Sequence, residues 1–176
     1  MELVAEKGKS VAVSAKEKKF ISAGLAIAEE LESRAISFYG KASKKKGVRP
    51  DLKDLFSLLI QEEKNHLKVI KALEKIMKKQ GAFERTKVKG KTPAKKIFRK
   101  GKDFSRALSS GEISMGLWAL EAERLSRQFY ESMAKKSKTP AAKGFFSQLA
   151  AFEKRHYKMI DDALEQIAGT EGLFST

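Results

Sequence analysis

Two glutamate–histidine pairs with the same spacing are the residues of this chain best suited to chemistry. The segment QEEKNH places Glu63 three positions before His66, and the segment FEKRH places Glu153 three positions before His156. The chain contains no other histidine. Residues three apart on a helix are neighbours on one surface, so each pair can offer a carboxylate and an imidazole to one metal ion. One such pair is common on helices, but two copies indicate a metal centre.

Two further glutamates share a helix face with an aromatic residue. Glu32 lies seven positions before Tyr39, and Glu123 lies seven positions before Tyr130. Residues seven apart differ by only about 20° around a helix, so these carboxylates are expected to point inward.

Four buried carboxylates at one level are strongly unfavourable unless they are neutralised, and two divalent cations would supply four positive charges. One Glu from each of two helices, with Glu-x-x-His from each of two others, is the ligand set of a dinuclear site in a helix bundle. The predicted metal ligands are Glu32, Glu63, His66, Glu123, Glu153 and His156.

The chain has no cysteine, so oxygen and nitrogen atoms must hold any metal. This ligand set suits two iron ions, with manganese or zinc as possible substitutes, and cobalt or nickel could also occupy the site. Tyr39 and Tyr130 have two interpretations at this point. They are either packing aromatics, or phenols that donate hydrogen bonds to the ligand carboxylates.

Apolar residues recur at helical spacing in four windows, and none shows the alternation of a strand, so the fold class is all-α. Ser14, three positions before Glu17, is expected to cap a first helix that starts at or before Phe20. Asp51 is expected to be the N-cap of the second helix, and Thr139 that of the fourth. The expected helices cover about residues 20–42, 51–80, 112–136 and 140–169.

Connection lengths predict how the helices are arranged. About eight residues join the first two helices and about three join the last two, whereas about 30 separate the second from the third. Short connections favour antiparallel hairpins, and the long one can run the length of a four-helix bundle. The expected division is an N-terminal extension or helix start (1–19), a helical domain (20–168) with its crossover (81–112), and a C-terminal tail (169–176).

The two hairpins repeat one pattern. ELESRAISFY aligns with EAERLSRQFY, matching Glu32 with Glu123 at an offset of 91, and the two histidine motifs align at an offset of 90. Two copies of one hairpin explain both offsets better than chance does.

LESRAISFY, EEKNH, EAERLSRQFY and FEKRH resemble the four helical motifs of the rubrerythrin branch of the ferritin-like superfamily. The resemblance covers about residues 20–168 and implies a ferritin-like four-helix bundle. It implies that Glu32 and Glu123 are terminal or chelating ligands and that Glu63 and Glu153 bridge the metals. It also implies an iron centre that reduces hydrogen peroxide, or that oxidises ferrous iron with oxygen or peroxide.

The chain departs from the family pattern in two respects. Without cysteine it holds no rubredoxin-type iron centre, so an external electron donor or ferrous iron itself must supply electrons. Many rubrerythrins carry an additional glutamate on the third helix, whereas Leu120 and Ser126 stand three positions before and after Glu123. The resemblance therefore supports metal binding more directly than it supports peroxidase activity.

A net charge of +15 keeps another class of function open. Residues 85–106 contain ten basic residues and one acidic residue, which suits a solvated connector or nonspecific attraction to nucleic acid or another anionic surface. Three functions thus remain: a peroxide-reducing di-iron enzyme, a ferroxidase or iron-handling protein, and a basic binding protein with a structural metal. We expect a cytoplasmic location, no membrane segment, and a homodimer that could exchange hairpins.

Overall fold

A computed structural model describes residues 13–79 and 110–170, and within these ranges the chain forms four α-helices and no strand. The fold is the all-α four-helix bundle that the sequence predicts. The helices are α1 (Ala15–Ala42), α2 (Pro50–Lys79), α5 (Glu112–Lys136) and α6 (Pro140–Thr170).

Side-chain caps set two of the helix starts, and a proline sets a third. Ser14 Oγ accepts a hydrogen bond from the backbone N–H of Glu17, and Thr139 Oγ1 accepts one from Ala142, so both predicted caps are confirmed. The predicted cap at Asp51 is wrong, because α2 already begins at Pro50. Proline is well suited to the first helical position, since its fixed φ fits a helix and its missing N–H would have no partner there.

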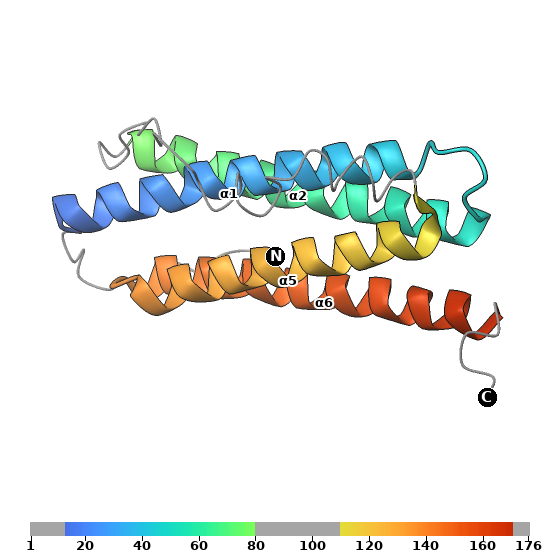
Figure 1. The fold of residues 1–176 in the computed structure, drawn as a ribbon. Coiled ribbons are helices and arrows are strands. Elements are labelled where there is room, and N and C mark those ends of the chain that lie inside the picture. Colours follow the sequence, from blue (N-terminus) through green and yellow to red (C-terminus); the bar gives the residue numbers. More distant parts are fainter. Residues whose placement is uncertain (1–12, 80–109, 171–176) are drawn as a thin grey trace, which may run out of the picture.

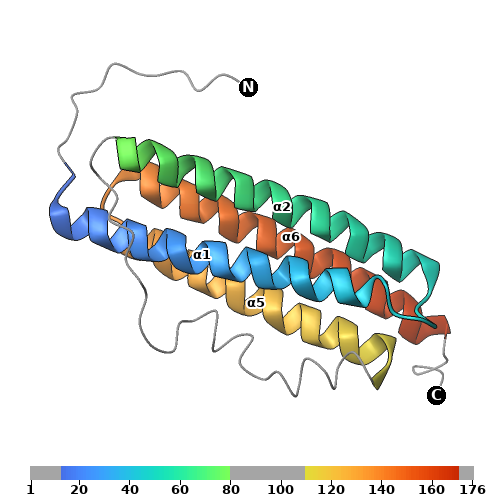
Figure 2. The ribbon, with the colours of Figure 1, turned by 90° about the horizontal axis from the view of Figure 1, so that it is seen from above.

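The four helices form two antiparallel hairpins, α1–α2 and α5–α6, stacked as two layers (Figure 1). The hairpin connections lie at opposite ends of the bundle, so α5 runs opposite to α1, and α6 runs opposite to α2. Seen from above, α2 and α6 lie along one side of the bundle, with α1 and α5 along the other (Figure 2). All four helices therefore run side by side at the midpoint of the bundle's length, where each can contribute side chains to one site.

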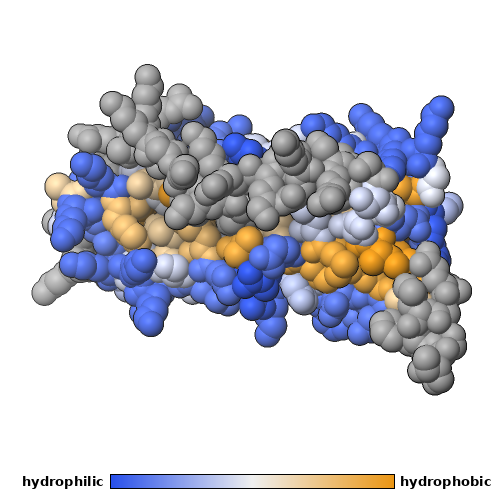
Figure 3. All heavy atoms as spheres, in the orientation of Figure 1, coloured by the Kyte–Doolittle hydropathy of each residue, from blue (hydrophilic) through white to orange (hydrophobic). Residues whose placement is uncertain are grey.

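The apolar core is divided into two clusters along the bundle. One contains Leu25, Ile70 and Phe146, and the other contains Phe38, Phe56 and Ile160, with every helix contributing to both. Half-buried apolar residues surround the clusters, and hydrophobic side chains form a band along the face where α1 and α5 lie (Figure 3). The layer between the two clusters holds the buried charged groups described below.

One glutamate from each hairpin bonds to the connection of the other hairpin. Glu17, in the first turn of α1, is 5% exposed, and its Oε1 accepts a hydrogen bond of 2.7 Å from the backbone N–H of Lys138. Glu112, in the first turn of α5, accepts one from the backbone N–H of Arg49. These bonds tie the two layers together at both ends of the bundle.

The crossover between the hairpins falls mostly on residues 80–109, which lie outside the described residues, as does the basic segment 85–106. Helix α6 extends to Thr170, and the rest of the expected tail is also outside the described ranges. None of the described helices has the length and apolar character needed to span a membrane.

Candidate metal centre

The structure brings all six sequence-predicted ligands together in the layer between the two core clusters. Helix α1 supplies Glu32 and α5 supplies Glu123, whereas α2 and α6 each supply a Glu-x-x-His pair. None of the six is more than 5% exposed: Glu32, Glu63, His66, Glu123, Glu153 and His156. All six lie near the middle of long helices and none lies in a loop, so they share one level of the bundle.

The faces of α1 and α5 are set by local sequence. Glu30 and Glu121, two positions before the inward glutamates, point outward and pair with Arg34 at 2.8 Å and with Arg124 at 2.7 Å. Residues two apart on a helix lie on different faces. The outer ion pairs and the buried glutamates therefore indicate the same orientation of each helix about its own axis.

Four-residue groups of potential ligand atoms, each with all its atoms within 4.8 Å of one another, define two halves of the centre. The His66 half-site comprises Glu32, Glu63, His66 and Glu153, and the His156 half-site comprises Glu63, Glu123, Glu153 and His156. Glu63 and Glu153 belong to both groups. This overlap is the arrangement expected when two carboxylates are shared between two metal ions.

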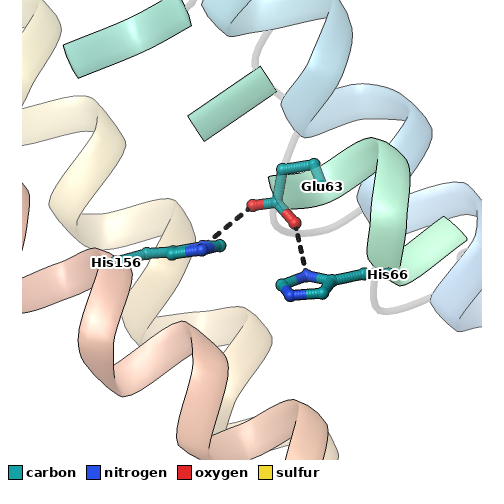
Figure 4. Close-up of side chains that lie close together, drawn as sticks. All are labelled: Glu63, His66 and His156. Carbon is teal, nitrogen blue, oxygen red and sulfur yellow. Dashed lines mark hydrogen bonds and ion pairs between the residues drawn. The ribbon is translucent and has the colours of Figure 1, made fainter. Parts of the chain in front are cut away.

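Glu63 lies between the two imidazoles, with one oxygen directed at each (Figure 4). Its Oε2 is 2.9 Å from His66 Nδ1, and its Oε1 is 3.1 Å from His156 Nδ1. Glu32 and Glu123 approach the same nitrogens at longer distances, since Glu32 Oε2 is 3.8 Å from His66 Nδ1 and Glu123 Oε2 is 3.7 Å from His156 Nδ1. Both imidazoles therefore present Nδ1 to the centre.

In the His156 half-site, the buried atoms Glu123 Oε2 and Glu153 Oε1 make no hydrogen bond, and His156 Nδ1 makes only ion-pair contacts, with Glu63 Oε1 and Glu123 Oε2. Buried polar atoms are normally satisfied, so a convergent set without hydrogen bonds needs an explanation. Two carboxylate oxygens and an imidazole nitrogen are suitable ligands for a divalent transition metal. The residues present thus fit a metal centre, although they do not identify the metal.

Tyr39 and Tyr130 are fully buried core residues and also hydrogen-bond donors to the centre. The Tyr39 hydroxyl donates to Glu123 Oε1, and the Tyr130 hydroxyl donates to Glu32 Oε1. Each bond crosses between α1 and α5, so a tyrosine of each hairpin holds a buried carboxylate of the other. The two sequence interpretations of these tyrosines, packing and hydrogen bonding, therefore both apply.

Protonation in the metal-free protein follows from burial and mutual repulsion. Burial and the Glu63 carboxylate raise the pKa of Glu32, and burial with the Glu123 carboxylate raises the pKa of Glu153. Burial alone also raises the pKa of Glu63, but its polar interactions with Glu32, His156 and His66 outweigh burial and lower it.

The imidazoles respond to the same carboxylates. Burial lowers the pKa of both, but Glu32 and Glu63 outweigh this effect at His66 and raise its pKa to about 9. At His156, Glu123 and Glu63 raise the pKa to about 11. Burial and the neighbouring carboxylates also raise the pKa of the Tyr39 and Tyr130 phenols, which stay protonated as donors.

Three residues next to the centre were not found by sequence reasoning. Glu62 Oε2 lies 2.7 Å from His156 Nε2 and 2.8 Å from a guanidinium nitrogen of Arg155. Burial raises the pKa of Glu62, but Arg155 and His156 lower it by more, so this carboxyl is ionised. Phe152 stacks on His66, with ring centroids 4.6 Å apart and ring planes 10° apart. The doubled glutamate in QEEKNH was the available signal for Glu62.

Comparison with known proteins identifies a family. A family model described as Rubrerythrin matches the chain over residues 24–116 and over residues 117–175, so the boundary between the two matched segments lies near the start of α5. No curated protein and no solved structure shows significant similarity to the chain. The matched residues include all six predicted ligands and both hydrogen-bonding tyrosines.

Proposed function

We propose that this chain, which belongs to the rubrerythrin family, is a non-haem di-iron oxidoreductase that reduces hydrogen peroxide at the buried carboxylate and histidine centre. The observation that carries the proposal is that Glu63 and Glu153 belong to both half-sites. Isolated acidic clusters are common on protein surfaces, whereas two shared, buried carboxylates serve no evident packing purpose. They are suited to holding two metal ions close together.

The donor set supports an assignment of each residue. Glu32 and His66 would hold one ion, Glu123 and His156 would hold the other, and Glu63 and Glu153 would contact both. Two divalent ions balance the charge of the four carboxylates, which removes the cost of burying them together. Mixed oxygen and nitrogen ligation without thiolate favours iron or manganese over softer metals.

Bound ferrous ions supply Lewis acidity and the two electrons that, with two protons, reduce one hydrogen peroxide molecule to two water molecules. An external donor then returns the electrons. The protein's part is to hold the ligands in position before the reaction, which the four long helices and the two flanking core clusters do. The same apolar clusters keep bulk water from the centre.

The two tyrosines fix the terminal carboxylates. Each phenol keeps its proton on the hydroxyl oxygen and donates it in a hydrogen bond, so Oε1 of Glu123 and of Glu32 is occupied. The second oxygen of each carboxylate faces the imidazole of its own half-site, where it can act as a ligand. Tyr39 and Tyr130 thus orient ligands and need not touch a metal ion.

Ferrous protein mixed separately with hydrogen peroxide and with oxygen in a stopped-flow spectrometer tests the reaction. The proposal predicts that ferric absorption rises faster with peroxide than with oxygen at equal concentration. Faster oxidation by oxygen would contradict it and would assign the chain as a ferroxidase or oxidase. The buried positions three before and three after Glu123 are Leu120 and Ser126, neither of which is a carboxylate, so the choice between peroxide and oxygen needs this direct test.

A further inference from the structure

The two hairpins differ at the position just before each Glu-x-x-His pair, whose side chain contacts the histidine of the other hairpin. At the offset of 90 that aligns Glu63 with Glu153, Glu62 aligns with Phe152. A carboxylate in one copy of the hairpin is therefore replaced by an apolar ring in the other, although the three predicted ligands of each copy, two glutamates and a histidine, match between the copies.

On the His156 side, this position forms a hydrogen-bonded chain. Glu62 comes from α2 and reaches across to α6, where its Oε2 is 2.7 Å from His156 Nε2. Arg155, next to the histidine, donates to the same oxygen at 2.8 Å and holds the carboxylate in place. An ionised carboxylate can only accept, so Nε2 carries the proton. Nδ1 is then the nitrogen that faces the centre, where it lies 3.1 Å from Glu63 Oε1.

On the His66 side, the corresponding contact is apolar. Phe152 lies parallel to the His66 ring at a centroid distance of 4.6 Å, and the Arg155 guanidinium lies 5.2 Å from the Phe152 ring centroid. Within residues 13–79 and 110–170, the carboxylates paired with His66 are those of Glu32 and Glu63, and both contact Nδ1. Phe152 restricts the tilt of the imidazole but offers no acceptor to Nε2.

A carboxylate on the outer nitrogen of a metal-binding histidine fixes the tautomer and makes the inner nitrogen more basic, and its loss usually costs about 10- to 100-fold in metal affinity. We propose that the two metal positions are unequal and that Glu62 is a positioning residue which makes the His156 half-site bind its ion first and more tightly. This inference rests on the dinuclear centre proposed above. The two half-sites have the same types of ligand, so the ligands alone do not determine which metal position fills first. The contact of Glu62 does.

Zinc titration followed by nitrogen-15 NMR of the imidazoles tests the order. Zinc(II) is diamagnetic, and the chain has only two histidines, so each ring gives its own signals. Comparison with His66→Gln assigns them. In the unmodified protein, the His156 signals should change during the first equivalent of zinc, and those of His66 during the second.

Glu62→Ala should remove this preference by weakening the first step about 10- to 100-fold, while two zinc ions still bind. Glu131→Ala is the matched control, because Glu131 is an exposed glutamate that also pairs with an arginine, Arg127 at 3.4 Å. The control should fill in the unmodified order. Phe152→Glu, which supplies a carboxylate on the His66 side, should bring the two steps closer together.

Two results would overturn the inference while leaving the centre intact: parallel changes of both imidazoles in the unmodified protein, or an unchanged order of filling in Glu62→Ala. If zinc shifts neither imidazole, the dinuclear centre itself is wrong, and the proposed function fails with it. The two failures are therefore distinguishable in one titration series.

Discussion

At the scale of single residues, the carboxyl of Glu153 carries a cost that packing does not explain. Burial and the neighbouring Glu123 and Glu63 raise its pKa, which means that the folded protein disfavours its ionised form. A carboxyl with a raised pKa favours the folded state most when the pH is below the pKa that it has in the unfolded chain. This contribution is lost as the pH rises through its folded-state pKa, so at neutral pH the buried carboxyl destabilises the metal-free protein. A metal ion at the site would offset this cost.

Glu153→Gln should therefore separate stability from metal binding. At about pH 7.5 the neutral amide should raise the free energy of unfolding of the metal-free protein by on the order of 1 kcal/mol, or about 2–4 °C in the melting midpoint. The same variant should lose the rise in melting temperature that metal causes in the unmodified protein. Thermal melts with and without zinc measure both effects. A metal-free variant that is less stable than the unmodified protein would contradict this account.

Tyr39→Phe tests the tyrosine bonds. Removing the hydroxyl leaves Glu123 Oε1 buried without its donor. Metal affinity should fall by about 10- to 100-fold, as is usual when a residue that orients a ligand is lost. Tyr157→Phe is the control, because Tyr157 is half-buried at the edge of the core and has no part in the six-residue centre. Chelator competition measures both variants, and equal affinities would refute an orienting role for Tyr39.

At the scale of elements, the bonds between hairpins give a prediction that is independent of metal. Glu17→Ala leaves the backbone N–H of Lys138 without its acceptor, so it should destabilise the protein by about 1–3 kcal/mol. Metal stoichiometry should not change, because Glu17 lies at the end of the bundle, far from the central layer.

Chemical unfolding compares Glu17→Ala with Glu165→Ala, an exposed glutamate on α6. The control should change the unfolding free energy by no more than about 0.5 kcal/mol. Equal stability of the two variants would show that the hydrogen bond to Lys138 does not stabilise the packing of the two hairpins.

The elements also show how much the sequence could predict. Helical periodicity, the doubled hairpin and the Glu-x-x-His pairs predict four helices and the inward direction of the six charged residues, because these depend on spacing along one helix. The contact of Glu62 with His156 was missed because it depends on how α2 and α6 pack, which spacing within one helix does not determine. The start of α2 was misplaced because two good starting residues, Pro50 and Asp51, are adjacent.

At the scale of the whole molecule, proton uptake and metal binding should be linked. The pKa values of about 9 for His66 and about 11 for His156 mean that both imidazoles are protonated in the metal-free protein at neutral pH. They add stability below about pH 6.5, the ordinary histidine pKa, and this contribution disappears as the pH rises through the folded-state values. A metal ion must displace these protons in order to bind.

Apparent zinc affinity should therefore increase from about pH 6 to about pH 8, by roughly tenfold per pH unit for each proton displaced. Binding should release protons into a weakly buffered solution, which an indicator dye records directly. An affinity that is constant over this range, with no proton release, would show that the imidazoles are not ligands.

The central claim is that one chain holds two metal ions at the centre formed by four helices. Anaerobic addition of ferrous iron to metal-free protein, with bound and free iron separated and counted, tests it most directly. We predict saturation at two ions per chain in the unmodified protein, and loss of stable binding of both in Glu63→Ala, since Glu63 belongs to both half-sites. Saturation at one ion or none, or two ions retained by Glu63→Ala, would contradict the account.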